Sequence, residues 1–197
     1  PWDGIFGINA SMKEKPLFGF IDAILYEYIN TIRQQAKDEE ARGRASFYNN
    51  FVAYNSGWTS RGKVIGNSLA VFDPARRRGG LVTNNMFIGH HVGLSGSLND
   101  KVEFKTLITY SRNYGQFRDR RNDVPFDGVS DRQAKKFFRD RSEFRKDQYS
   151  FRLAADYALT PENKWVVNAS LNWDTGEFYA DNVGFSLGIT WYNIFTY

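Results

Sequence analysis

Hydrophobic and polar residues alternate with a period of two along much of the chain, which is the pattern of a β-strand with one apolar and one polar face. In Lys164–Asp174, for example, Trp, Val, Ala, Leu and Trp alternate with mainly polar residues. The same alternation predicts seven strands, several of them longer than the roughly five or six residues usual in soluble sheets. The predicted strands are Trp2–Ala10, Leu17–Asn30, Asn85–Leu98, Lys101–Gly115, Gln148–Ala158, Lys164–Asp174 and Gly184–Tyr197.

The connections between these strands are alternately short and long. The short ones are Ser11–Pro16, Asn99–Asp100 and Thr160–Asn163, and the long ones are Thr31–Asn84, Gln116–Asp147 and Thr175–Asn182. Since antiparallel neighbours reverse direction, all short turns fall at one edge of the sheet and all long loops at the other. This layout is typical of an outer-membrane barrel, so 31–84 and 116–147 are predicted to be long extracellular loops. A short helix is expected in the first of them, within "NTIRQQAKDEEARGRA".

Aromatic residues gather near the ends of the predicted strands, on their apolar faces. They are Trp165, Trp173, Tyr149, Tyr157, Tyr110, Phe185 and Tyr197. Transmembrane barrels carry such aromatic girdles at both membrane interfaces. The sequence therefore predicts an all-β fold, an antiparallel transmembrane β-barrel. The alternative is a large β-sandwich or a lipocalin-like barrel, in which the apolar side would point inward and such long strands would be unusual.

Seven strands are an odd number, whereas bacterial single-chain barrels have an even number so that the first and last strands can pair. An unpaired edge facing lipid costs several kcal/mol for each unsatisfied backbone group. We therefore expect residues 1–197 to be the C-terminal portion of a single, larger barrel domain whose remaining strands lie elsewhere. The final stretch "GFSLGITWYNIFTY" is similar to the C-terminal targeting strand of such barrels, which places the C-terminus in the periplasm.

Composition narrows the function classes. Cysteine is absent, which excludes disulfides, zinc–thiolate sites and thiol nucleophiles. The net charge of +4 is modest, and the basic residues of 116–147 are interspersed with carboxylates, which argues against nucleic acid as a partner. The chain has no G-x-S-x-G motif, phosphate-binding loop or Cys/His dyad, so we expect no catalytic residues and no cofactor in it, and we predict that it is not an enzyme. The alternative is an outer-membrane enzyme whose catalytic residues lie in the missing part of the barrel.

Three motifs carry a family resemblance. They are "YNN" at Tyr48–Asn50, "GWTSRGKVIGN" at Gly57–Asn67 and the "NN…HHVGLSG" strand. Over Tyr48–Tyr197 the chain resembles the Wzi family of capsule assembly outer-membrane proteins, particularly its Bacteroidota-type members. Departures from the family pattern fall near Ser60, where an aromatic is expected, and near Ser68, where a proline is expected. The family's N-terminal strands and periplasmic helical region are also missing.

The resemblance implies a non-enzymatic barrel of about eighteen strands in the bacterial outer membrane, with long extracellular loops. Such proteins help to hold capsular or surface polysaccharide at the outer leaflet. The implied partners are outer-membrane lipid and lipopolysaccharide, surface polysaccharide, the missing N-terminal strands and other outer-membrane proteins. Two alternatives remain open: a porin-like channel for anionic solutes, and an accessory barrel subunit of a larger secretion or uptake complex.

A glycan site needs an aromatic face for the sugar ring and planar polar groups for its hydroxyls, and six residues in and before the "GWTSRGKVIGN" motif provide this set. They are Asn49, Asn50, Tyr54, Trp58, Arg61 and Asn67. The alternative is that the Asn and Gly residues here only shape a long loop.

Metal sites are not predicted. His90 and His91 are adjacent in a strand, so their side chains point to opposite faces and cannot share one ion. The spacing of Asp119, Asp123 and Asp127 fits no calcium loop, and these carboxylates are expected to be solvated.

Overall fold

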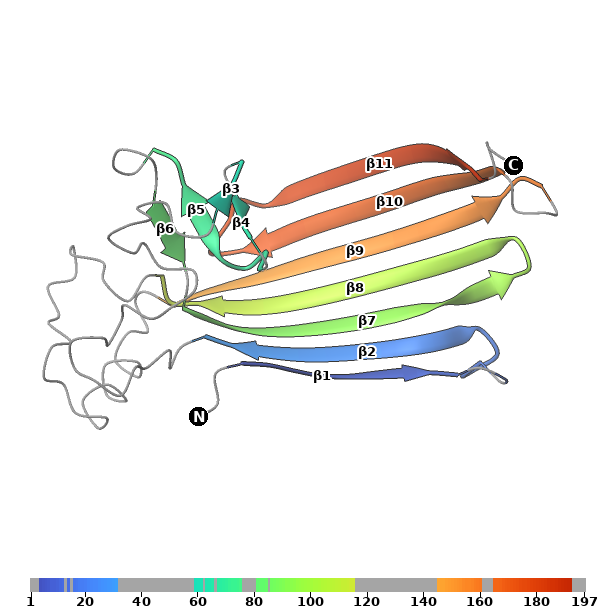
Figure 1. Ribbon diagram of the computed structural model, residues 1–197, viewed down its shortest axis with the longest axis horizontal. Coiled ribbons are helices and arrows are strands. Elements are labelled where there is room, and N and C mark those ends of the chain that lie inside the picture. Colours follow the sequence, from blue (N-terminus) through green and yellow to red (C-terminus); the bar gives the residue numbers. More distant parts are fainter. Residues whose placement is uncertain are drawn as a thin grey trace, which may run out of the picture. The chain divides into compact units, whose positions relative to one another are not determined.

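Seven long strands form one antiparallel sheet in the order β1-β2-β7-β8-β9-β10-β11 (Figure 1). The computed structural model describes residues 4–12, 14, 16–31, 59–61, 63–65, 67–75, 81–84, 86–115, 145–160 and 165–192. The long strands are β1 Gly4–Ser11, β2 Ile21–Asn30, β7 Phe87–Asn99, β8 Val102–Asn113, β9 Lys146–Ala158, β10 Trp165–Gly176 and β11 Asn182–Trp191. The predicted all-β fold and its seven strands are confirmed for this part of the chain. The predicted end of the last strand, 193–197, lies outside the described residues.

The start of β2 differs from the prediction because a tight turn takes up its first residues. The backbone N–H of Leu17 donates to the carbonyl of Ile21 at 2.9 Å. Phe18 and Gly19 have φ values of 55° and 80°, the left-handed region that a regular strand does not visit. The strand therefore begins at Ile21 rather than Leu17.

The turn between β7 and β8 is shifted by one residue from the predicted Asn99–Asp100. Asn99 is the last residue of β7, and Asp100–Lys101 form the turn. The Asn99 Oδ1 accepts from the backbone N–H of Lys101 at 2.9 Å and of Val102 at 3.1 Å. The asparagine side chain thus closes the turn on its own backbone, a role for which its short amide suits it.

Four short strands lie within the predicted loop Thr31–Asn84. They are β3 Thr59–Ser60, β4 Lys63–Val64, β5 Val71–Asp73 and β6 Leu81–Asn84. The first two pair with each other, as do the last two. Segments of two to four residues are too short to show a readable alternation, which is why the sequence did not predict them. The expected helix and most of the predicted loop 116–147 fall on residues that the structure leaves undescribed.

The chain groups into two compact units. The first comprises Pro1–Ile5, Ile29–Gly89 and Ser111–Asp147 and holds the four short strands. Its hydrophobic core consists of buried side chains with partly buried neighbours packed against them. The core residues are Val64, Ala70, Val82 and Phe87, with Ile29, Leu69 and Phe72 packed on them.

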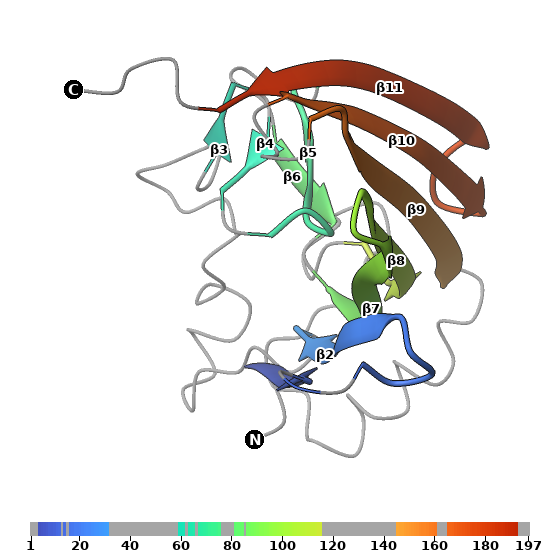
Figure 2. The same cartoon turned by 90° about the vertical axis from the view of Figure 1, so that its right-hand side faces the viewer.

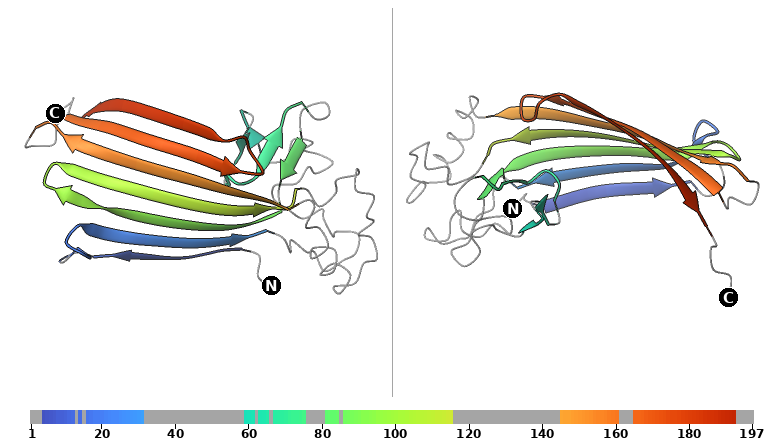
Figure 3. Two further views of the ribbon diagram at one scale, coloured as in Figure 1. Left: turned by 180° about the vertical axis from the view of Figure 1, so that it is seen from behind. Right: turned by 90° about the horizontal axis from the view of Figure 1, so that it is seen from above.

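The second unit comprises Phe6–Tyr28, His90–Tyr110 and Gln148–Tyr197, and it contains most of the long strands. Figures 1 and 3 show its three tight connections, β1–β2, β7–β8 and β9–β10, at one end of these strands. The predicted placement of the short turns at one edge is therefore confirmed. The connection predicted as long at Thr175–Asn182 is instead short, because β10 continues to Gly176 and only residues 177–181 separate it from β11. Within the described residues, no helix is long and apolar enough to cross a membrane.

Candidate functional site

The two faces of β9, β10 and β11 differ sharply in chemistry. These strands lie side by side (Figure 2), and their register pairs Leu171 with Phe185 on one face and Ser170 with Ser186 on the other. The first, apolar face is exposed: Leu171 keeps 49% of its surface accessible and Phe185 keeps 70%. Several other large apolar side chains of this face are also exposed. They include Leu153, Leu187, Ile189 and Val183.

The polar face is held together by side-chain hydrogen bonds between neighbouring strands. The Asn168 Nδ2 donates to Asp156 Oδ1 at 2.7 Å, and the Thr190 hydroxyl donates to Asn168 Oδ1 at 2.6 Å. One step along the strands, the hydroxyls of Ser170 and Ser186 lie 2.7 Å apart. The predicted alternation is thus confirmed on both faces of these three strands.

A row of five rings crosses β1, β2, β7, β8 and β9. Its ring centroids are separated by 6.5 Å, 5.2 Å, 6.1 Å and 5.1 Å. The rings, in order, belong to Phe6, Tyr28, His90, Tyr110 and Tyr149, and we call them the five-ring row. On β2, β7, β8 and β9 these residues lie near the strand end that adjoins a long connection. The row therefore marks one edge of the apolar face.

A second group of aromatic rings lies toward the short turns. The rings of Trp165 and Trp191 stack with their centroids 4.9 Å apart. The ring centroids of Phe20 and Phe104 are 6.2 Å apart. On β9 and β10 a further stacked pair, Phe151 and Trp173, lies toward the opposite strand end, with centroids 5.4 Å apart. The aromatic residues thus concentrate at the two ends of the apolar face, and aliphatic residues occupy its middle.

His90 and His91 occupy opposite faces, as predicted. The His90 Nδ1 lies 2.9 Å from the hydroxyl of Tyr26, within the aromatic surroundings of the five-ring row. The His91 Nδ1 lies 2.6 Å from the Thr109 hydroxyl. Across the described residues, no group of three His, Asp or Glu side chains is arranged to hold a metal ion.

The predicted glycan residues are only partly described. Asn49, Asn50, Tyr54 and Trp58 lie outside the described residues. Arg61 is exposed and follows β3 directly, with a left-handed φ of 49°.

The second described member of the predicted set, Asn67, has a local structural role. Its Oδ1 accepts from the backbone N–H of Leu69 at 2.9 Å, which closes a turn of the chain. For Asn67 the loop-shaping alternative therefore has direct support.

Two buried asparagines form a polar junction in the first unit that the sequence did not predict. Asn84 and Asn113 are 0% and 1% exposed, and the Asn84 Nδ2 donates to Asn113 Oδ1 at 2.8 Å. Asn84 also donates to the Leu69 carbonyl at 3.0 Å and accepts from the Gly115 N–H at 3.1 Å. These bonds tie β6 to the loop before β5 and to the end of β8.

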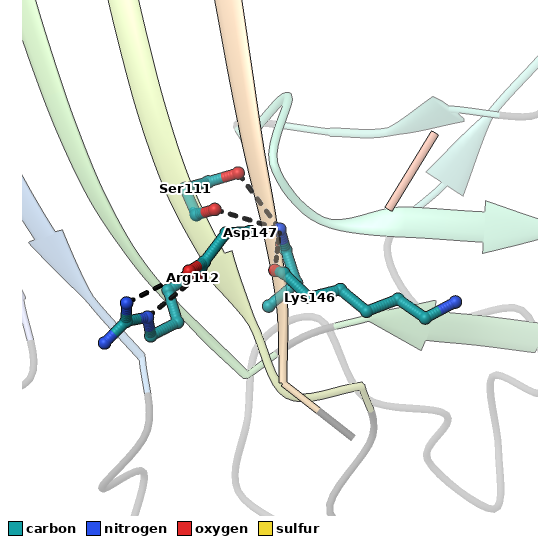
Figure 4. A network of polar contacts seen from close by, with 5 residues as sticks. Ser111, Arg112, Lys146 and Asp147 are labelled. Carbon is teal, nitrogen blue, oxygen red and sulfur yellow. Dashed lines mark hydrogen bonds and ion pairs between the residues drawn. The ribbon is translucent and has the colours of Figure 1, made fainter. Parts of the chain in front are cut away.

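Asn113 extends this junction to β9. Its Nδ2 donates to the Ser111 hydroxyl at 3.0 Å and to the Lys146 carbonyl at 3.3 Å (Figure 4). Because a buried amide without partners costs about 1–3 kcal/mol, this complete set of bonds stabilises one arrangement of the three segments.

A bidentate ion pair lies beside this junction. The Arg112 Nε donates to Asp147 Oδ1 at 2.8 Å and its Nη2 to Oδ2 at 3.0 Å. The nearby Tyr114 has a pKa above its usual value, chiefly because burial disfavours the phenolate, while Arg112 and Arg145 oppose this rise. The side chains of Arg112 and Asp147 remain 33% and 26% exposed, so the pair contributes no more than about 1 kcal/mol to stability.

Gln148 fixes the connection between β10 and β11. Its Oε1 accepts from the backbone N–H groups of Phe178 at 3.2 Å and Tyr179 at 3.0 Å. Its Nε2 is buried and has no hydrogen-bond partner among the described residues. The pKa of Tyr179 is raised, first by burial and then by the charge of Asp174.

No family model, no curated protein and no solved structure matches this chain.

Proposed function

We propose that this chain is part of a non-enzymatic outer-membrane β-barrel that anchors or organises capsular or other surface polysaccharide at the cell surface. The observation that carries the membrane location is the apolar face, an exposed aliphatic band with aromatic rings at both ends. In water such a face would be unfavourable, since burying one Leu or Phe side chain is worth about 1.5–3 kcal/mol. A hydrocarbon environment removes this cost.

The length of the band fits the outer membrane. Trp165 and Trp173 lie eight positions apart on β10, which corresponds to about 26 Å along a strand. With the usual tilt of about 40°, the band spans about 20 Å along the membrane normal, before the aromatic rings at its two ends are included. Transmembrane barrels carry an apolar band of about 25 Å between their aromatic girdles. The hydrogen-bonded polar face would then line the interior.

The two edges of the sheet support a larger barrel. In an antiparallel sheet of seven strands, the edge strands β1 and β11 run in the same direction. They therefore cannot pair with each other in an antiparallel barrel, and an odd number of further strands is needed between them. A barrel of about eighteen strands, as the Wzi resemblance implies, would supply eleven.

The polysaccharide role rests on the Wzi-like motifs and on Arg61. This residue is exposed beside the short strands β3 and β4, which belong to one of the long connections. In the proposed barrel these connections face outward from the cell. A guanidinium in that position suits the carboxylate or phosphate groups of an acidic polysaccharide.

Retention of purified surface polysaccharide by the protein tests this role. We expect Arg61→Ala and Trp58→Ala to reduce retention, and Lys63→Ala to leave it unchanged. Lys63 is a matched control because it is also exposed and its replacement removes the same charge two residues away. Wild-type retention by both Arg61→Ala and Trp58→Ala would exclude these residues from the site.

A channel for anionic solutes is the second candidate, because the polar face would line a lumen. That face carries Arg152 together with Asp156 and Asp174, so its charges have both signs and do not favour anions strongly. Conductance of the protein in planar bilayers separates the two functions. Large ohmic currents would contradict a role limited to anchoring.

A further inference from the structure

The ion pair Arg112–Asp147 lies just beyond the five-ring row on two neighbouring strands. Arg112 follows Tyr110 by two positions on β8, and Asp147 precedes Tyr149 by two positions on β9. Because side chains two apart in a strand point to the same face, both charged groups belong to the apolar face of their strands. They lie on the side of the long connections, where that face ends.

Three further features make this position electropositive and rich in donors. The Tyr114 hydroxyl is hydrogen-bonded to Arg112, and the charge of Arg145 acts on the same hydroxyl. The Asp147 carboxylate accepts from Nε and Nη2 of Arg112, and these two bonds fix the orientation of the guanidinium plane. The side chain of Lys146 extends away from this group (Figure 4). The charges of Arg112, Arg145 and Asp147 all act on the Tyr114 hydroxyl, so two guanidiniums and one carboxylate surround it.

This chemistry matches a phosphate group at a membrane surface. A planar guanidinium binds phosphate oxygens through parallel N–H donors, and a phenol adds a further donor. The aromatic row of a membrane barrel lies at the level where the lipid headgroups begin. A lipid whose acyl chains cover the apolar face would thus bring its phosphate to Arg112 and Arg145.

We propose that Arg112, Tyr114 and Arg145 bind the phosphate of an outer-leaflet lipid headgroup, with Asp147 positioning Arg112. This inference rests on the proposed membrane location and adds a defined lipid site to it. The occupant is an anionic, phosphorylated lipid rather than free phosphate, because Arg112 and Asp147 follow Tyr110 and Tyr149 along the continuous strands β8 and β9.

The test folds the protein into phosphatidylcholine nanodiscs that contain either bisphosphorylated lipid A or fully dephosphorylated lipid A. Native mass spectrometry then measures the fraction of protein that retains the added lipid. We expect the phosphorylated form to be retained about tenfold better. Arg145→Gln should abolish most of this preference, and Lys146→Gln, which removes the neighbouring charge, should keep it. Arg145 lies outside β9 and is exposed, so its replacement is not expected to impair folding.

Each failure has its own meaning. A protein that does not enter nanodiscs at all contradicts the proposed membrane location. Entry with equal retention of the two lipids, or equal losses for Arg145→Gln and Lys146→Gln, overturns the headgroup site alone. Displacement of the lipid by excess inorganic phosphate would also overturn it, because the site would then recognise the free ion.

Discussion

The indole ring of Trp165 on β10 lies flat against that of Trp191 on β11, with their centroids 4.9 Å apart and their planes 5° from parallel. The two residues are direct partners in the register of these strands. Their stack ends the apolar face on the side of the short turns. It joins the outermost described strand to the rest of the sheet.

This stack should couple the stability effects of the two residues. A double-mutant cycle of Trp165→Ala and Trp191→Ala is expected to give a coupling free energy of about 0.5–1.5 kcal/mol, beyond the lost apolar area. Urea unfolding of the protein in lipid vesicles provides the four free energies. Additive losses would show that the rings do not stabilise each other.

Leu171 and Asn172 are adjacent on β10 but face opposite ways, so they compare the two faces directly. In the proposed barrel, Leu171→Arg places a charge in lipid between the middle of the band and its Trp173 end. It should cost about 2 kcal/mol, because the cost of about 2–4 kcal/mol at the midplane falls toward the interfaces. Asn172→Arg enters the polar face and should be tolerated. Folded yield in vesicles, read from heat-dependent electrophoretic mobility, measures both. In a sheet exposed to water the two variants would behave alike, since surface substitutions there change stability by about 0.5 kcal/mol or less.

Asn84 provides a test of the buried junction. Asn84→Ala leaves the Leu69 carbonyl, the Asn113 amide and the Gly115 N–H without their bond to residue 84, which should cost about 3 kcal/mol. Asn67→Ala removes a single, partly buried bond to a backbone N–H and should cost about 1 kcal/mol or less. Denaturant unfolding compares the two. Similar losses would mean that the junction contributes little.

Glycine is required at residue 96 but not at residue 188. An added Cβ at Gly96 would overlap the backbone carbonyl oxygen of Phe20. At Gly188, no atom of the described residues lies within 4 Å of an added Cβ. Gly96→Ala should therefore force β2 and β7 apart and cost at least about 1–3 kcal/mol. Gly188→Ala should be neutral. Equal stability of the two variants in thermal unfolding would contradict this account.

The raised pKa of Tyr179 predicts a loss of stability at high pH. The folded protein holds this phenolic proton more tightly than the unfolded chain, so the contribution is complete below about pH 10 and is lost as the pH rises through the raised pKa. Tyr179 keeps 45% of its surface exposed, so the effect is small. The ultraviolet absorbance of the phenolate, taken as the difference between wild type and Tyr179→Phe, reports this pKa. Asp174→Asn should lower it in part, because burial is the larger cause. A value at or below that of free tyrosine would refute the prediction.

Much of this fold could be predicted from the sequence because its strands have two different faces. The alternation in Lys164–Asp174 predicted the strand and also which side of it carries Trp165 and Trp173. The same rule placed His90 and His91 on opposite faces. Period-two patterning depends only on neighbours in the chain, so it needs no tertiary information.

The polar junction could not be predicted in this way. Asn84 and Asn113 lie 29 positions apart, and nothing in either segment specifies the partner. The same holds for Gln148, whose side chain reaches backbone groups 30 and 31 positions away. Of the predicted glycan residues, only Arg61 and Asn67 are described, and the bond from Asn67 to the Leu69 N–H became visible only in the fold.

The order of strands in the sheet also bears on how fast it assembles. β1–β2, β7–β8, β9–β10 and β10–β11 are joined by short connections, but residues 31 to 86 separate β2 from β7. Closing these 56 residues costs about 2 kcal/mol more entropy than closing the six-residue link 159–164 between β9 and β10. Long-range pairing of this kind is slow. We expect the local hairpins to form first and the pairing of β2 with β7 to limit the folding rate. This pairing requires a close approach at Gly93 and Gly96, where a Cβ would crowd Leu25 and Phe20.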